Sequence, residues 1–501
     1  MKKIINMTLL STALAFIGLW GCEPDDIGEL NFDYFLIEND TIRVSENRGL
    51  KPEDLPKAGG DPSIISETKN LPPKPRNLAP VPDFVLNDKE IRNQSSNGQS
   101  ELNFMAFGSS YAAGVINGGY NNATMETSYP NLIARQLKLK NFNQPKFDNQ
   151  NFNGFVTKER TENNDFTKGH LNKFAAANNN LATPGSAPIK GLVNNFSVPF
   201  IGRRALSYQF ESLKKINGLE YRYLERFSKK NHSKIYDYYK DETPDFYTLE
   251  NGIDDLRLLV FNNMATLLTY SSYARNAKFP EEHTSSAEIK LVHAFDFKGN
   301  GKKENTPKGF IATVPNLAEF PVCNLKSYND GVKELGFWHF YYRNPQGEIS
   351  EMWPEERFLP TAAVDSLFSK NVNMAFKKGL TKENPLEAKD IFYRSKIRGV
   401  ENYIDDMNTH YAFLAEKYGV HLVDLNTLFT QIIKGQFVTW DGNKVDASYK
   451  GGNFFNEDGL SLTPFGQSIL ANTFLAKMNE IYKTNIPLIS TSFYLTQSES
   501  K

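Results

Sequence analysis

Four short apolar segments recur along the chain, and each runs into a turn built from Gly, Ser, Asn, Asp or Pro. Runs of this length that end in such turns predict buried β-strands. Between the last two of them, residues 400–418 repeat apolar side chains at helical spacing and end before a glycine, which predicts a helix. Strands that alternate with helices indicate a parallel sheet with its polar turns at the carboxyl edge. The four predicted strands are residues 104–107, 246–249, 309–314 and 420–423.

The sequence also predicts two more helices and two insertions. Helical spacing predicts helices at 129–139 and 464–482. Residues 140–196, rich in Asn, Gly and Lys, and residues 320–384 do not follow the pattern, so we expect both to be insertions on the loop edge. The second insertion contains an aromatic run at 337–342. Such a run is typical of a core, although on an insertion it is also compatible with a contact surface.

The amino terminus has the features of an export signal. Lys2 and Lys3 precede an apolar stretch at 7–20, which is too short to cross a bilayer comfortably. The residues Leu-Trp-Gly-Cys at 19–22 resemble a bacterial lipobox. This resemblance implies cleavage before Cys22 and a lipid on its thiol. The alternative is an uncleaved anchor that happens to contain a cysteine.

The residues after the lipobox indicate where the protein is exposed. Glu23, Asp25 and Asp26 resemble the acidic export signals of surface lipoproteins in Bacteroidota, although an ordinary hydrophilic spacer has a similar composition. We therefore expect a lipid-anchored outer-membrane protein that faces the cell exterior. The chain has two cysteines. If Cys22 carries the lipid, Cys323 is a lone thiol and no intramolecular disulfide can form.

Charge and composition restrict the partners and divide the chain. The 57 Lys+Arg and 58 Asp+Glu give a net charge of -1, so no basic field favours a nucleic-acid partner. The segment after the signal is rich in Pro, Asp, Asn and Lys, and it contains too little apolar area to offset its chain entropy. The predicted organisation is a signal at 1–21, an extended tether at 22–100, an α/β domain at 101–485 and a tail at 486–501.

Four motifs stand in order near the predicted strand ends. They are Gly-Ser-Ser-Tyr-Ala-Ala-Gly at 108–114, Asn-Leu-Ala-Thr-Pro-Gly at 180–185, Gly-Ile-Asp-Asp at 252–255 and Asp-Gly-Leu-Ser-Leu-Thr-Pro-Phe-Gly at 458–466. Together they resemble the blocks of the SGNH (GDSL) hydrolase superfamily, nearest to its lipoprotein branch in Bacteroidota. The resemblance implies a three-layer, flavodoxin-like α/β fold. It also implies Ser110 as nucleophile, the Gly185 N–H as oxyanion donor and Asp458 as the acid that orients a histidine.

Several residues that this chemistry needs are replaced. Ser461 stands at the position of the family's histidine, and a serine cannot act as general base at neutral pH. Asp254 replaces an asparagine whose N–H₂ would donate to the oxyanion, whereas an ionised carboxylate only accepts hydrogen bonds. Ser109 replaces the usual Asp or Asn of the nucleophile loop. The nucleophile survives, but the groups that activate it do not.

Two ways in which the site could still be functional remain open. A histidine from elsewhere could reach Ser110, or Asp254, Asp255 and Asp458 could bind Ca²⁺ or Mg²⁺, whose ligands are oxygens. Their spacing matches no metal loop, and no phosphate-loop, zinc or dinucleotide motif is present, so we expect neither a metal nor a cofactor. The histidines available are His170, His232, His283, His293, His339, His410 and His421.

These features predict a surface-exposed outer-membrane lipoprotein with an inactive SGNH-like domain. Its retained function is then binding. The expected role is an accessory subunit of an outer-membrane β-barrel complex in uptake or protein biogenesis. A second possibility is that the cleft in which hydrolases of this superfamily bind substrate holds a glycan or acyl ligand. A third is an active serine esterase or deacetylase with a relocated histidine.

Overall fold

The computed structural model describes a discontinuous set of residues, all within one compact unit, Gly60–Lys501. The predicted signal and lipidation residues Cys22, Glu23, Asp25 and Asp26 lie outside the described residues, as does Gly185. No described helix has the length and apolar character needed to cross a membrane. The described residues are 65–67, 77–86, 89, 91–92, 101–116, 120–147, 154–157, 189, 191–199, 226–227, 238, 244–261, 307–449 and 451–498.

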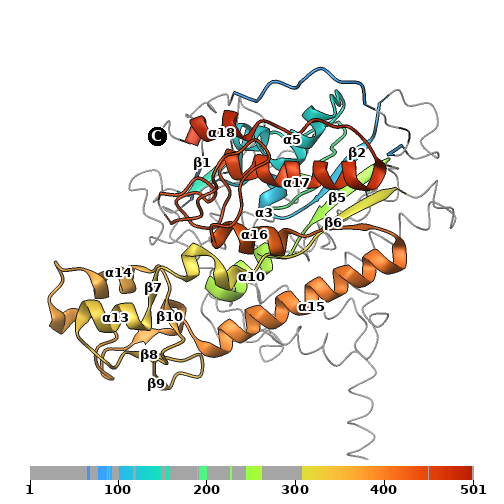
Figure 1. The fold of residues 1–501 in the computed structure, drawn as a ribbon. Helices are drawn as coiled ribbons and strands as arrows, with labels where there is room; N and C mark the ends of the chain where they lie inside the picture. The colour runs from blue at the N-terminus through green and yellow to red at the C-terminus, as the bar shows by residue number, and fades with distance from the viewer. Residues whose placement is uncertain are drawn as a thin grey trace, which may run out of the picture. The chain divides into compact units, whose positions relative to one another are not determined.

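A four-stranded parallel sheet forms the centre of the fold, in the order β13-β6-β5-β2 (Figure 1). Every residue of β2 and β5 is buried, as expected for strands covered on both faces. The four strands predicted from the apolar runs are confirmed. Their bounds are β2 Phe104–Gly108, β5 Phe246–Glu250, β6 Lys308–Ala312 and β13 His421–Val423.

A further segment extends this sheet beyond β2. The Ala106 N–H donates to Asn194 O at 2.8 Å, and the N–H groups of Phe196 and Val198 donate to Ala106 O and Gly108 O at 2.8 and 2.9 Å. A parallel bridge pairs Ala106 with Asn195. When the edge segment and the four strands are numbered along the chain, their order across the sheet is 2-1-3-4-5. This order is found in doubly wound α/β folds. The end of the predicted insertion at 140–196 is therefore part of the sheet.

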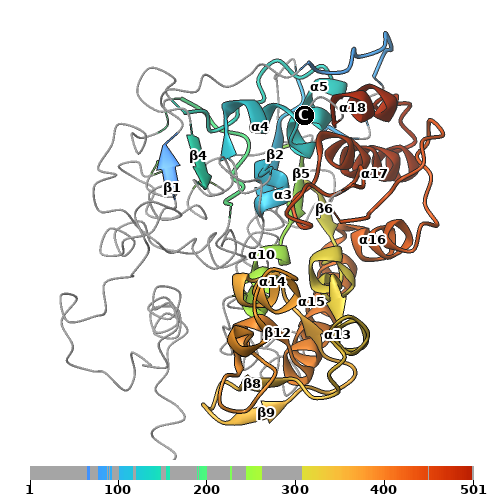
Figure 2. The same ribbon diagram turned by 90° about the vertical axis from the view of Figure 1, so that its left-hand side faces the viewer.

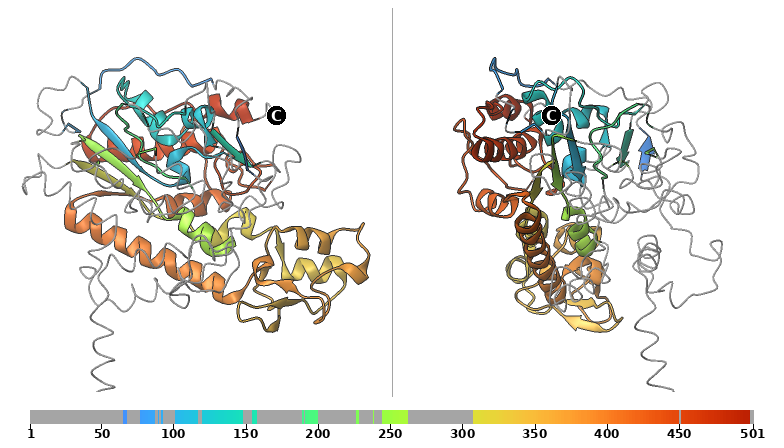
Figure 3. Two further views of the ribbon diagram at one scale, coloured as in Figure 1. Left: turned by 180° about the vertical axis from the view of Figure 1, so that it is seen from behind. Right: turned by 90° about the vertical axis from the view of Figure 1, so that its right-hand side faces the viewer.

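Helices lie along both sides of the sheet (Figures 1 and 3). α15 packs against α10, β6 and β13, while α17 packs against α5, β13 and α18. The predicted helices are confirmed, although α15 begins six residues earlier than its apolar spacing indicated. The bounds are α3 Ser110–Ala113, α4 Asn122–Glu126, α5 Tyr129–Gln136, α10 Ile253–Phe261, α15 Arg394–Tyr418, α16 Leu425–Ile433, α17 Pro464–Tyr482 and α18 Thr491–Ser498.

The second predicted insertion, at 320–384, forms a small lobe that continues to residue 393 (Figure 2). It contains two three-stranded sheets, β12-β10-β7 and β11-β8-β9, and a separate cluster of buried side chains that includes Phe340, Phe358 and Leu367. Its elements are β7 Lys326–Ser327, α13 Tyr328–Leu335, β8 Tyr341–Arg343, β9 Ile349–Glu351, β10 Arg357–Phe358, α14 Ala362–Phe368, β11 Leu386–Glu387 and β12 Ile391–Phe392. Short 3₁₀ turns lie at η6 Leu317–Glu319, η7 Pro321–Cys323, η8 Met374–Phe376 and η9 Ala388–Asp390.

Parts of the predicted tether pack against the α/β domain. β1 (Ile65–Glu67) pairs with β4 (Gly154–Thr157), which also pairs with β3 (Tyr120–Asn121). The Ala79 N–H donates to the Tyr494 hydroxyl at 3.0 Å, and Ile91 is fully buried. Residue 100 is therefore not the point at which contact with the domain begins.

The predicted tail at 486–501 is also held by the domain. α18 lies against α17, and Ile486, Ile489 and Tyr494 are buried. The apolar residues among its Ser and Thr are enough to cover one face of α17.

Candidate functional site

The Ser110 turn is built from two closely packed strands. β2 ends at Gly108, where an added Cβ would lie 2.4 Å from the backbone oxygen of Glu250, so only glycine fits. α3 begins at Ser110 and ends after one turn at Gly114, whose φ of 84° is in the left-handed region. Ser109 and Ser110 are thus held at the carboxyl edge of the sheet, and both are buried.

Asp254 binds both polar groups of Ser110. The Ser110 hydroxyl donates to the two carboxylate oxygens at 2.8 and 2.9 Å, and the Ser110 N–H donates to Oδ2 at 2.9 Å. Asp254 lies in the first turn of α10, and Arg257 Nε is 3.3 Å from its Oδ1. Both members of this ion pair are almost fully buried.

This arrangement differs from that of a serine that performs acyl transfer. Such a serine needs N–H donors aimed at the point where negative charge develops on the substrate oxygen, and the N–H of the serine itself can be one of them. Here the Ser110 N–H already bonds to Asp254. A carboxylate therefore occupies the direction from which an oxyanion would be bound.

Glu250 is a site residue that the sequence analysis missed. It accepts the Ser109 hydroxyl at 2.7 and 2.8 Å and the N–H groups of Ser109 and Ala112 at 3.4 and 3.3 Å. The pKa of Glu250 is raised from 4.5 to about 7, chiefly by burial; the hydrogen bonds from Ser109 oppose this shift and the charge of Asp254 adds to it. Its signal in the sequence is a single acidic residue at the end of an apolar strand.

The Asp458 turn shows what replaces the missing histidine. The Ser461 hydroxyl donates to Asp458 Oδ2 at 2.6 Å, and the N–H groups of Leu460 and Ser461 donate to Oδ1 at 2.9 and 2.8 Å. The Ser461 hydroxyl donates to Asp458, as an imidazole N–H would donate to an orienting acid. Asp458 is thus used to hold its own turn.

Tyr111 joins this turn to the Ser110 helix. Its hydroxyl donates to Leu460 O at 3.1 Å. The pKa of Tyr111 is raised well above its ordinary value, first by burial and then by the charges of Glu250, Asp458 and Asp254. The structure therefore brings together three of the segments that the motifs singled out.

Polar side chains support this site from α17. The Gln467 amide accepts the Tyr129 N–H at 2.9 Å and donates to Tyr111 O at 3.1 Å. One side chain of α17 thus fixes the start of α5 and the short helix α3.

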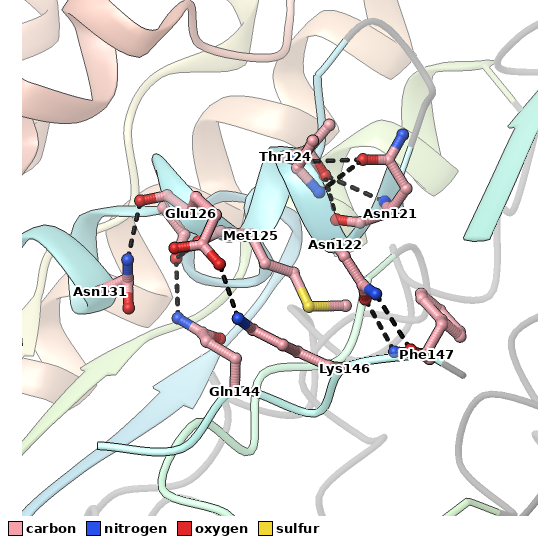
Figure 4. A network of polar contacts seen from close by, with 11 residues as sticks. Asn121, Asn122, Thr124, Met125, Glu126, Asn131, Gln144, Lys146 and Phe147 are labelled. Atoms are coloured by element: carbon pink, nitrogen blue, oxygen red, sulfur yellow. Dashed lines mark hydrogen bonds and ion pairs between the residues drawn. The ribbon is translucent and has the colours of Figure 1, made fainter. Parts of the chain in front are cut away.

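A second polar network holds the segment after α5 (Figure 4). Asn122 and Phe147 exchange hydrogen bonds at 3.0 and 2.7 Å, and Lys146 pairs with Glu126 at 2.7 Å. Within the same segment, Gln144 accepts from Asn195 at 3.0 Å, and Asn195 also donates to Ala112 O at 2.9 Å. The network thus ties the edge segment of the sheet to α3.

The described histidines lie in other parts of the fold. His339 pairs with Glu351 in the lobe. His421 opens β13 in register with Phe310, and the same row reaches Ala106 across two more strands, about 14 Å away at about 4.8 Å per strand. His410 lies on α15 beside Tyr411. The other candidates, His170, His232, His283 and His293, are outside the described residues.

The other predicted site features are placed as follows. Within the described residues, no group of three or more His, Cys, Asp or Glu side chains is arranged to hold a metal ion. Gly185 lies outside the described residues, so its role as oxyanion donor stays a prediction.

Comparison with family models, with curated proteins and with solved structures finds no match.

Proposed function

We propose that this protein is a surface-exposed outer-membrane lipoprotein whose SGNH-like domain does not hydrolyse esters and instead serves as an accessory subunit of an outer-membrane β-barrel complex. The domain is the flavodoxin-like, three-layer form of that superfamily. Two features support this fold: the 2-1-3-4-5 sheet order, and the meeting of the Ser110, Asp254 and Asp458 segments beside Tyr111.

One observation supports the proposed loss of hydrolase activity. The Asp254 carboxylate accepts both the N–H and the O–H of Ser110. An ester oxygen that approached Ser110 would meet a carboxylate in place of hydrogen-bond donors, and removal of one such donor already costs about 10²–10³ in rate. The Asp458–Ser461 pair supplies no imidazole to accept the serine proton.

The binding role rests on the remaining features. The sequence predicts a lipid on Cys22 and an acidic surface-export signal behind it. The lobe has its own core, yet it exposes Trp338, Trp353 and Phe376 to solvent. Exposed aromatic residues that no core requires are typical of contact surfaces for other proteins.

An activity-based probe tests the first half of the proposal. We expect a fluorophosphonate to leave the purified protein unlabelled, with no hydrolysis of acetyl or longer acyl esters. The Ser110→Ala variant should be indistinguishable from the parent. Labelling that disappears in Ser110→Ala would establish an active esterase and would overturn the proposal.

Co-purification tests the second half. Purification of the tagged protein from native outer membranes in mild detergent should yield a stoichiometric β-barrel protein, identified by mass spectrometry. A tagged lipoprotein of unrelated fold from the same membranes serves as control. A monomer, or a partner shared with the control, would contradict the accessory role.

A further inference from the structure

α10 connects the Ser110 site to the junction between the lobe and the α/β domain. Within Ile253–Phe261, every residue whose side chain the structure describes is buried. The helix packs against α15 and η6. Gly252, just before it, has a φ of 113°, and an added Cβ there would lie 2.7 Å from the Val314 side chain. Close packing therefore surrounds α10.

The first turn of α10 carries the contact with Ser110. The Asp254 carboxylate accepts the Ser110 hydroxyl at 2.8 and 2.9 Å and the Ser110 N–H at 2.9 Å. Hydrogen bonds to an ionised carboxylate are shorter and stronger than those between neutral groups, so they depend closely on distance. The position of α10 therefore decides how well this carboxylate reaches Ser110.

The last turn of α10 carries the contact with the lobe junction. Lys396 lies in the first turn of α15 and is 1% exposed. Its ammonium donates to Val260 O of α10 at 2.9 Å. It also donates to Ala388 O and Ile391 O of the lobe, at 3.4 Å each. Three carbonyl oxygens thus accept the three N–H groups of a charged ammonium.

The two contacts belong to one short helix. Asp254 and Val260 are six residues apart, which is about 9 Å along the helix axis. Without the ammonium, Val260 O would be a buried carbonyl that has lost a charged donor, which is unfavourable. A shift of α10 toward a new partner would move Asp254 as well, because dense packing leaves little room for the helix to bend.

We propose that α10 couples the lobe to the Ser110 turn, so that loss of the contact at either end of the helix weakens the contact at the other. By linkage, the effect is the same in both directions. The coupling is independent of the accessory role, and its test requires no partner protein. It provides a route by which binding at the lobe reaches the Ser110 turn.

Hydrogen exchange of the full chain tests the coupling from the side of the lobe. Lys396→Met removes the ammonium and keeps most of the length of the side chain. The amides at 110–115 should lose protection at least fivefold, relative to those at 470–480 in α17. Lys389→Met removes an exposed lysine of the same lobe and should leave them unchanged. A folded Lys396→Met variant with parental protection at 110–115 would overturn the proposal.

The reverse direction uses Ser110→Ala, which removes the hydroxyl that Asp254 binds. Protection of the amides at 387–391 should fall at least threefold by the same measure. This variant leaves Lys396 in place, so it tests the coupling even where Lys396→Met does not fold. Parental protection at 387–391 would contradict the coupling.

A double-mutant cycle in urea unfolding gives a further test. Ser110→Ala changes no charge, so the direct attraction between Asp254 and Lys396 cancels in the cycle. For independent sites, the effects of Ser110→Ala and Lys396→Met on the unfolding constant multiply. We expect the double variant to be at least threefold more stable than that product, whereas Ser110→Ala with Lys389→Met should match it. A product that holds for both pairs would show that the two ends of α10 are independent.

Discussion

At the scale of single residues, the site consists of serine hydroxyls bound to carboxylates. Each hydroxyl donates to a different buried acid, so the polar groups near Ser110 satisfy one another. None of these pairs supplies an imidazole that could remove a serine proton. The pairs are Ser109 with Glu250, Ser110 with Asp254 and Ser461 with Asp458.

Two substitutions should return reactivity to Ser110. In the double variant Asp254→Asn, Ser461→His, the amide N–H₂ of the new asparagine can donate to an oxyanion. The imidazole of the new histidine can donate its N–H to Asp458. We expect fluorophosphonate labelling of the double variant, at least tenfold above each single variant. Gel-based fluorescence measures it. The same double variant with Ser110→Ala is the control, and a folded double variant without labelling would contradict the interpretation of this site.

Glu250 should make stability depend on pH in a particular direction. Its pKa is raised from 4.5 to about 7 in the folded protein, so between these values the folded state holds a proton that the unfolded state has released. The free energy of unfolding therefore falls as pH rises through this window, by about 1.4 kcal/mol per pH unit. Glu250→Gln keeps an acceptor for Ser109 but removes this titration.

Urea unfolding at pH 5.0 and pH 7.5 measures the effect. The stability of Glu250→Gln relative to the parent should rise by about 2.4 kcal/mol between these two pH values. Other titrating groups are common to both proteins and cancel in the comparison. Parallel pH profiles would show that Glu250 is not the group responsible.

The sequence allows some of these residues to be predicted but not their pairing. Ser110, Asp254 and Ser461 follow from motif position, whereas their hydrogen bonds depend on how the segments pack. Glu250 was missed because the end of a buried strand and the start of a loop look alike in sequence. The role of the Glu250 carboxyl depends on its hydrogen bond with Ser109, which is 141 residues away in the chain.

At the scale of elements, the lobe should be a cooperative unit of its own. Phe358 is fully buried, and its ring meets those of Phe340 and Phe368 edge-on at 5.3 and 5.2 Å. Phe358→Ala should destabilise the lobe by about 3–5 kcal/mol because it leaves a cavity. Hydrogen exchange should show the loss of protection in the lobe, with the sheet β13-β6-β5-β2 unchanged.

Trp338→Ala is the matched control, since Trp338 is 70% exposed. It should change stability by no more than about 0.5 kcal/mol. Equal loss of protection in the lobe and in the main sheet would show instead that the two unfold together.

Elements with a continuous apolar run were predictable, and those without one were not. β2 and β5 are buried at every residue, and β6 is buried at every residue but its first, so the sequences of these strands are largely apolar. The edge segment at 194–198 reads Asn-Asn-Phe-Ser-Val and interrupts that pattern with polar residues. α18 was missed because its helical period is masked by Ser and Thr, although Tyr494 is buried.

At the scale of the whole molecule, we expect a lipid on Cys22 to determine where the protein resides. Several acyl chains on one residue anchor a protein durably, at about 0.8 kcal/mol for each buried methylene. Cys22→Ala should therefore move the protein from the detergent phase to the aqueous phase in a Triton X-114 partition. Mass spectrometry of the amino-terminal peptide provides an independent check. A variant that stays in the detergent phase would contradict lipidation at this residue.

The architecture of the whole domain was predictable because alternating strands and helices permit few arrangements. The attachment of residues 77–92 was not, because that stretch has the composition of a free linker. It is held by contacts with distant residues, such as the ion pair of Asp83 with Lys138 at 3.6 Å and the hydrogen bond from Lys308 to Arg92 O at 3.2 Å.

α15 gives the molecule a mechanical property. The helix has 25 residues and is therefore about 37 Å long; it begins at the lobe and ends where β13 begins. Because α15 packs against α10, β6 and β13, one continuous helix would transmit a displacement of the lobe to the edge strand of the central sheet.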